Sequence, residues 1–108
     1  MSDATGHGML MTTVSTRADA VRIADMLIGE KLAACVQMMP IESFYVWDGE
    51  SQKAAELLLL VKTRASLFEA AIARIRAVHP YEMPEIVATP FTAGFAPYLA
   101  WMDAATGG

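Results

Sequence analysis

The 108-residue chain is poor in several residue types, and each deficit excludes a class of protein. It has one cysteine, Cys35, which excludes an intrachain disulfide framework and a zinc site built mainly from cysteines. It has no asparagine and therefore no acceptor for N-glycosylation. Its longest aliphatic run, residues 57–61, is far too short to span a membrane. The first residues lack a cationic region followed by an apolar stretch, so we expect no signal peptide and a cytoplasmic protein.

Charged residues are also scarce, at 19%, whereas hydrophobic residues make up 55%. This balance excludes a disordered chain and leaves apolar surface for an oligomer interface as well as a core. The net charge of −4 argues against binding to nucleic acid and to an anionic membrane surface. We expect a flexible tail over residues 1–8 and a single domain over residues 9–105.

The spacing of apolar residues predicts four strands and three helices. Thr16 and Ser66 each open a box of the S/T-x-x-D/E form, which is typical of a helix start, and the helices that follow end near Gly29 and Val78. Strands are expected over residues 9–15, 33–47, 53–62 and 86–89, and a terminal helix begins at Pro97.

The pair Asp48-Gly49 is a strong hairpin signal between the two long strands. Pro40 predicts that the first of these lies at an edge or contains a bulge, and the apolar run 57–61 predicts that the second is central. The order β-α-β-β-α-β indicates an α+β, ferredoxin-like sandwich, extended here by a long hairpin and a C-terminal helix. The aromatic residues near the hairpin tip need cover, which we expect from another subunit.

Five segments resemble the CutA, or divalent-cation-tolerance, family. In chain order they are residues 30–36 (E-K-L-A-A-C-V), 45–49 (Y-V-W-D-G), 62–63 (K-T), 79–86 (H-P-Y-E-M-P-E-I) and 98–101 (Y-L-A-W). The resemblance implies a homotrimer of ferredoxin-like subunits joined by strand pairing, with an architecture similar to PII signalling proteins. It further implies a role in tolerance to divalent metal ions, copper especially, with copper binding in some members and no enzymatic activity.

The chain departs from some members of that family at two positions. Some bacterial members carry a cysteine implicated in copper binding where this chain has Thr12, and some carry a second histidine where it has Val78. A copper site in this chain would therefore lack both of these ligands.

The connection at residues 79–85 holds the main candidate site. An imidazole with nearby carboxylates suits Cu²⁺ or Zn²⁺, so His79, Glu82 and Glu85 are candidate metal ligands, with Cu²⁺ or another divalent cation as a non-obligatory ligand. Because a closed metal site usually needs four ligands, a second subunit or an external ligand would complete it. The alternative is a structural loop whose polar groups satisfy a buried interface.

Other side chains are assigned by their type and their place in the sequence. We expect a ligand or interface cleft formed by Tyr81, Lys62, Trp47 and Trp101. Cys35 is expected to be a small buried apolar residue, and His7 to lie in the solvated tail.

The leading interpretation is a trimeric, CutA-like protein of metal tolerance that binds metal or regulates. The alternative is a PII-like signalling trimer that senses a small anion or metabolite in its inter-subunit clefts. A small enzyme that uses His79 and Glu82, and a scaffolding trimer, are further alternatives.

Overall fold

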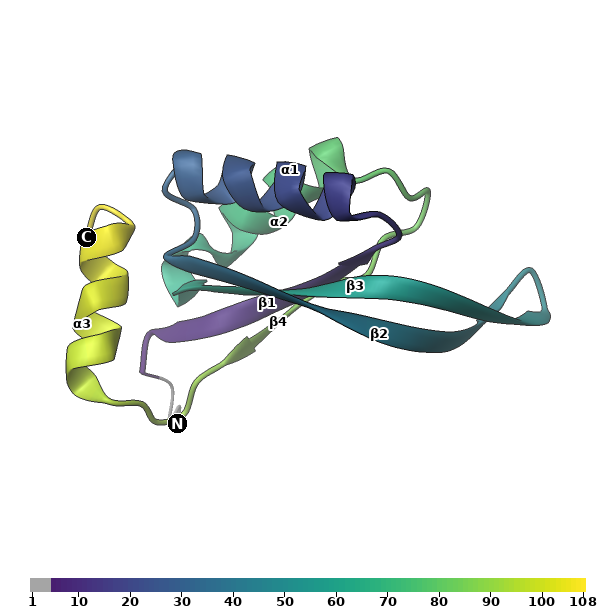
Figure 1. Ribbon diagram of the computed structural model, residues 1–108. Helices are drawn as coiled ribbons and strands as arrows, with labels where there is room; N and C mark the ends of the chain where they lie inside the picture. Colours follow the sequence, from purple (N-terminus) through teal and green to yellow (C-terminus); the bar gives the residue numbers. More distant parts are fainter. Residues whose placement is uncertain (1–4) are drawn as a thin grey trace.

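The computed structural model describes residues 5–108 and contains a four-stranded antiparallel sheet with two helices packed on one face (Figure 1). The elements are β1 (His7–Val14), α1 (Arg17–Gly29), β2 (Cys35–Trp47), β3 (Glu50–Arg64), the 3-10 turn η1 (Ala65–Leu67), α2 (Phe68–Val78), β4 (Ile86–Pro90) and α3 (Ala96–Ala105). The strand order β2-β3-β1-β4 is that of the ferredoxin-like fold, which confirms the predicted class. Within residues 5–108, no helix is both long and apolar enough to cross a membrane.

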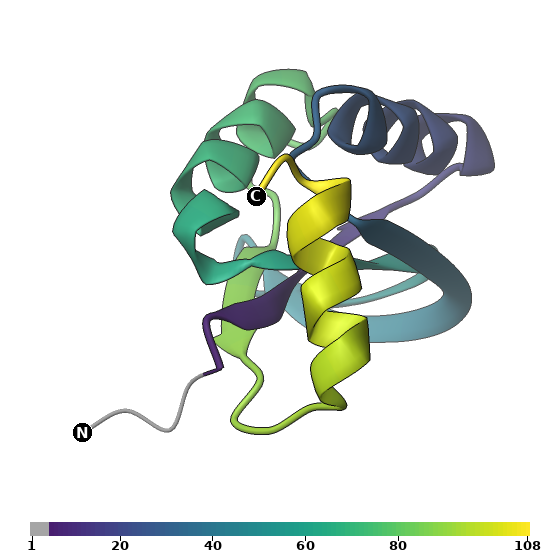
Figure 2. The ribbon, with the colours of Figure 1, turned by 90° about the vertical axis from the view of Figure 1, so that its left-hand side faces the viewer.

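The hydrophobic core lies between the sheet and helices α1 and α2. Leu10 on β1 and Val61 on β3 are partners in the strand register, so their side chains lie on the same face of the sheet. Every second residue of these strands joins them there, and the helices contribute Ile23, Leu27 and Ile75. Helix α3 packs at the end of the sheet away from the hairpin and does not lie beside α1 and α2 over its face (Figures 1 and 2).

The two helix-opening boxes have different outcomes. At α1 the box is confirmed, because the Thr16 hydroxyl accepts a hydrogen bond from the Asp19 N–H at 3.1 Å. At α2 it is wrong, because the chain enters this helix through η1 and no side chain caps its first turn. The Phe68 N–H donates to the Ala65 carbonyl instead, so the turn itself satisfies a donor that a Ser66 cap would serve.

Strand β1 starts at His7, two residues before the predicted start, so the expected tail of residues 1–8 is too long. His7 and Gly8 pair with Arg64 and Thr63 of β3, and His7 is buried. Gly8 is needed there because a Cβ atom would come within 2.3 Å of the Thr89 carbonyl oxygen. His-Gly has no strand propensity of its own, and its place is set by neighbouring strands. Residues 1–4 of the predicted tail lie outside the described residues.

The hairpin of β2 and β3 projects beyond the rest of the sheet (Figure 1). Strand β3 has 15 residues, but only its second half, from Leu57 to Arg64, pairs with β1. Pro40 lies on β2, which is an edge strand as predicted, and the run 57–61 lies on β3 between two neighbours. Toward the tip the side chains become solvent-exposed, with Phe44 at 70% and Val46 at 72%.

The hairpin turn has positive φ at both central residues, 53° at Asp48 and 76° at Gly49. This is the signature of a type I′ turn, whose twist matches that of the flanking strands. We predict that Gly49→Val lowers the free energy of unfolding by about 1–3 kcal/mol, because a β-branched residue resists positive φ. Urea unfolding at a fixed protein concentration measures the change.

Gly29→Val is the matched control for this variant. An added Cβ meets nothing within 4 Å at either position, but Gly29 ends α1 without a positive φ. The control is therefore expected to leave stability unchanged or slightly raised. Equal losses in the two variants would show that the φ of the turn is not the cause.

Candidate functional site

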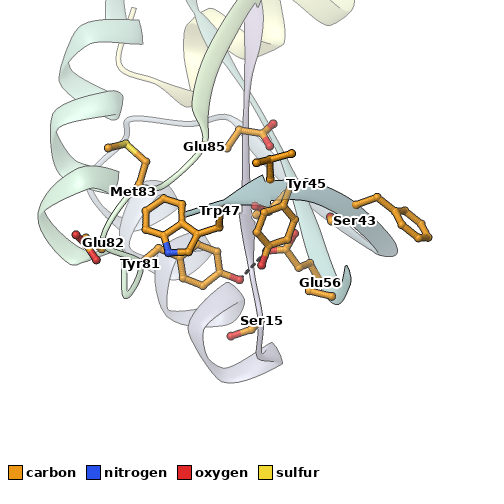
Figure 3. Close-up of a pocket in the computed structure, with 13 residues that line it drawn as sticks. Ser15, Ser43, Tyr45, Trp47, Glu56, Tyr81, Glu82, Met83 and Glu85 are labelled. Carbon is orange, nitrogen blue, oxygen red and sulfur yellow. Dashed lines mark hydrogen bonds between the residues drawn. The ribbon is translucent and has the colours of Figure 1, made fainter. Parts of the chain in front are cut away.

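A pocket of about 850 Å³ lies between the projecting hairpin and the connection that follows α2 (Figure 3). Strands β2 and β3 supply Tyr45, Trp47 and Glu56, and the connection supplies Tyr81. The remaining lining residues are small, polar or exposed: Thr13, Ser15, Ser43, Phe44, Val46, Ala54, Glu82, Met83 and Glu85. Its volume is within the range of about 300–1,000 Å³ that is usual for small-molecule sites.

A hydrogen bond between Tyr81 and Glu56 forms the floor of this pocket. The Tyr81 hydroxyl donates to Glu56 Oε2 at 2.6 Å, and Glu56 exposes only 9% of its surface. Burial, together with the hydrogen bond to the Glu56 carboxylate, raises the pKa of Tyr81 to about 12. The phenol therefore keeps its proton at neutral pH and remains a donor to Glu56.

His79 positions Tyr81 without itself lining the pocket. Its Nδ1 accepts a hydrogen bond from the Tyr81 N–H at 3.1 Å, and its Nε2 lies 2.9 Å from the Thr13 carbonyl oxygen. Since the first partner can only donate and the second can only accept, the ring is the neutral tautomer with its proton on Nε2. Burial lowers the pKa of His79, which favours this neutral form.

The predicted site residues divide into two groups. Trp47, Tyr81, Glu82 and Glu85 line the pocket, with His79 directly behind Tyr81. Lys62 and Trp101 do not line it. Lys62 pairs with Cys35 and Met9, six residues and about 20 Å along β3 from Glu56. Trp101 stacks on Tyr98 of α3, with ring centroids 5.5 Å apart.

The lone cysteine and the first histidine also lie far from this pocket. Cys35 is only partly buried, at the start of β2 on the sheet face that α1 and α2 leave open. His7 is not in a solvated tail, because its Nε2 lies 2.8 Å from Asp103 Oδ1 of α3. The expected tail fails here because contacts with a distant helix bury the ring.

The candidate metal ligands do not form a metal cluster within the chain. Among residues 5–108, no three His, Cys, Asp or Glu side chains come together in a way that could hold a metal ion. Both ring nitrogens of His79 are engaged, so a metal at Nδ1 must displace the Tyr81 N–H. Thr12 is fully buried on the core side of the sheet. The assignment of His79, Glu82 and Glu85 as metal ligands stays a prediction.

Sequence reasoning missed Glu56 and Ser15. A signal for Glu56 was present, since it is a lone carboxylate at the start of the apolar run of a central strand. Such a residue is seldom buried unless a partner satisfies it. Ser15 follows the last residue of β1 and carries no comparable signal.

Comparison with known proteins gives a consistent result. The model of the family described as "CutA1 divalent ion tolerance protein" matches residues 8–105. The divalent-cation tolerance protein CutA of Thermus thermophilus is 44% identical to this chain, over 92% of this chain and 97% of its own length. The chloroplastic protein CutA 1 of Oryza sativa is 42% identical. The rice match covers 91% of this chain but only 56% of the rice protein, so this chain spans about half the length of its chloroplastic relatives.

Solved structures agree with the sequence matches. The structure described as the periplasmic divalent cation tolerance protein CutA of Archaeoglobus fulgidus has a TM-score of 0.90 and 37% identity, covering 93% of this chain and 98% of that one. The crystal structure of CutA1 from Oryza sativa has a TM-score of 0.89 and 40% identity, covering 96% of each chain. The chain therefore belongs to the CutA1 divalent ion tolerance protein family.

Proposed function

We propose that this chain is a regulatory binding protein that acts as a homotrimer and takes a small ligand in the pocket above Glu56 and Tyr81. Its contribution to divalent-cation tolerance would then pass through that ligand. The observation that carries the proposal is the pocket itself, which is lined by the buried carboxylate of Glu56 and by the rings of Tyr45, Trp47 and Tyr81, among others.

The charge of the pocket modifies the metabolite-sensor alternative. Its thirteen lining residues include three carboxylates, on Glu56, Glu82 and Glu85, and no lysine, arginine or histidine. A small anion would be repelled by this lining. The small-molecule alternative is therefore retained, but an anion is not the ligand that the charges favour.

The trimer is supported by apolar surface that the single chain leaves uncovered. Helices α1 and α2 cover one face of the sheet, while the other face carries apolar side chains such as Met39 and Val87, each 46% exposed. Further exposed aromatic residues are Phe95, just before α3, and Trp101 on α3. Contiguous apolar surface of this kind usually marks an interface, and an exposed edge strand such as β2 is open to pairing with another chain.

Direct metal binding at the connection is the second candidate function. Glu82 and Glu85 are exposed and free of ion pairs with the described residues, and His79 lies in the same connection. A copper ion at His79 Nδ1 would take the place of the Tyr81 N–H. Metal binding would then be coupled to movement of Tyr81 and to opening of the pocket floor.

The first prediction from this proposal concerns mass. Light scattering in dilute buffer is expected to give about three times the 11.7 kDa of one chain, because closed symmetric assembly covers the edge strand β2 and the exposed aromatic side chains of α3. A monomer that persists at micromolar concentration would contradict the interface argument.

The second prediction separates the two candidate functions. A thermal-shift screen of small metabolites is expected to find compounds that stabilise the protein, and Trp47→Ala is expected to abolish their effect. Trp101→Ala is the matched control, because Trp101 is a similarly exposed indole outside the pocket. Both variants are compared with the parent at equal oligomer mass, since Trp101 belongs to the exposed aromatic surface of α3. In calorimetric titration with Cu²⁺, His79→Ala is expected to bind as the parent does, since the ring nitrogens of His79 are already engaged.

Two outcomes would contradict the preference for the ligand pocket over the metal site. Loss of copper binding in His79→Ala, with the trimer intact and binding kept in His7→Gln, would favour the metal site. A screen in which no compound stabilises the parent more than the Trp47→Ala variant would contradict the pocket as the working site.

The third prediction is a pH dependence of stability from His79. Its pKa is lowered by burial in the folded state, so the unfolded state binds more protons just below the ordinary value of 6.5. The stability that neutral His79 contributes is thus complete above about pH 6.5 and declines as the pH falls below it. Urea unfolding of the parent and of His79→Asn between pH 7.5 and roughly 5 measures the difference.

Asparagine is chosen because its side-chain oxygen can accept from the N–H two residues later, as His79 Nδ1 does, but it does not titrate. The parent is expected to lose its advantage over this variant as the pH falls. Parallel pH profiles for the two proteins would show that the His79 ring is not held neutral by the fold.

A further inference from the structure

The carboxylate of Glu56 has a hydrogen-bond partner but no positive partner. Only its Oε2 atom accepts from the Tyr81 hydroxyl, and no hydrogen bond from residues 5–108 reaches Oε1. Glu56 is also outside the ion pairs of the described chain, which join other acidic residues to His7, Arg22 and Arg74. A buried carboxylate of this kind normally has a cation beside it.

The surroundings of Glu56 add negative potential and offer no compensation. Glu82 and Glu85 line the same pocket, and no basic side chain does. Carboxylates that line one cleft with apolar walls give it a negative potential, which attracts positive ligands. Charge complementarity therefore selects a cation as the occupant.

The walls of the pocket select an organic cation over a hydrated metal ion. The rings of Tyr45, Trp47 and Tyr81 are turned toward the space above the Glu56 carboxylate (Figure 3). Aromatic faces attract ammonium and guanidinium groups, and they bury the carbon skeleton that such a ligand carries. Within residues 5–108 the carboxylates do not approach closely enough to form a metal cluster.

The polar atoms around the pocket suit a head group that carries N–H donors. Ser15 and Ser43 also line the pocket, and hydroxyl and carboxylate oxygens can all accept. A quaternary ammonium ion could use the aromatic walls but not these acceptors. A protonated primary amine or a guanidinium uses both.

From this combination we infer that the pocket binds a small organic cation, a primary ammonium or guanidinium compound, with its head group on Glu56 and its carbon skeleton against Tyr45 and Trp47. The inference rests on the proposed function, which requires only that the pocket takes some small ligand. It adds the chemical class of that ligand and the residue that selects it.

The test is a series of four probes with the same butyl chain and different head groups: n-butylamine, n-butylguanidine, n-butanol and sodium butyrate. Binding is followed on the full-length protein through the indole N–H signals of Trp47 and Trp101 in nitrogen-15 spectra, assigned with a Trp47→Phe variant. Only Trp47 lines the pocket, so its signal is expected to shift and that of Trp101 is the internal control. The two cations are expected to bind about tenfold or more tightly than butanol and butyrate, and less tightly at high salt.

Two variants separate the charge of Glu56 from its hydrogen bond. Glu56→Gln keeps the size of the side chain and an acceptor for Tyr81 but removes the charge, and is expected to remove the preference for the cations over butanol. Tyr81→Phe removes the hydrogen bond and keeps the charge, and is expected to retain that preference. Glu69→Gln, on α2 outside the pocket, is the matched control and is expected to behave as the parent.

Several results would overturn the inference. Butanol or butyrate binding as well as the amines, with no effect of Glu56→Gln, would mean a ligand that is not a cation, while the proposed binding function would stand. If none of the four probes shifts Trp47, the cation inference fails and the wider metabolite screen decides the proposed function separately.

If Glu56→Gln dissociates the oligomer in light scattering and the amines do not bind the parent, Glu56 pairs with a basic side chain of a second copy. Should Glu56→Gln fail to fold, the probe series on the parent and on Tyr81→Phe still decides the question.

Discussion

The unequal length of the strands is the constraint on which the rest of this structure depends. Strand β3 has 15 residues and β1 has 8, so β1 supports only the half of β3 from Leu57 onward. Glu56 is the first residue of β3 beyond that support. Where β1 ends, the connection after α2 reaches the open face of the sheet, and Tyr81 meets Glu56 there. The same mismatch leaves the hairpin without a layer of its own helices, so one feature produces both the pocket and the exposed apolar hairpin.

A short chain of hydrogen bonds holds the pocket floor to the centre of the sheet. It runs from the Thr13 carbonyl through the His79 ring to the Tyr81 N–H, and from the Tyr81 hydroxyl to Glu56. Pro80, between His79 and Tyr81, restricts the backbone. This restriction helps to keep the imidazole and the phenol edge to face, with their ring centroids 4.9 Å apart. The spacing H-P-Y thus has a structural reason that requires no metal. The imidazole accepts from one neighbour and donates to another because it is neutral, and its burial keeps it so.

The local features of the fold could be read from the sequence, and the features that depend on distant contacts could not. The turn at Asp48-Gly49 and the cap at Thr16 follow from residues adjacent in the chain. Residue type does not reveal which end of a strand faces which connection, so the sequence could not show that Lys62 and Tyr81 lie apart within one chain; the register of β3 with β1 and β2 does. The cleft that groups them stays a prediction. His7 was misplaced for the same reason, since its burial depends on Asp103, 96 residues later. Glu56 was missed because its role requires Tyr81, which lies beyond an entire helix.

The energetics of Glu56 connect the pocket to the stability of the fold. A buried carboxylate without a cation is costly, and here one phenolic hydrogen bond offsets only part of that cost. Tyr81 holds Glu56 through this one hydrogen bond, and no basic side chain of residues 5–108 forms an ion pair with it. Local departures of this kind from what stability favours are expected where a protein binds something. Any ligand that supplies the missing charge binds only the folded state and stabilises it in proportion to its concentration. The occupied and empty proteins would then differ most at Tyr81 and the connection behind it, which are the residues that border both the sheet and the open hairpin.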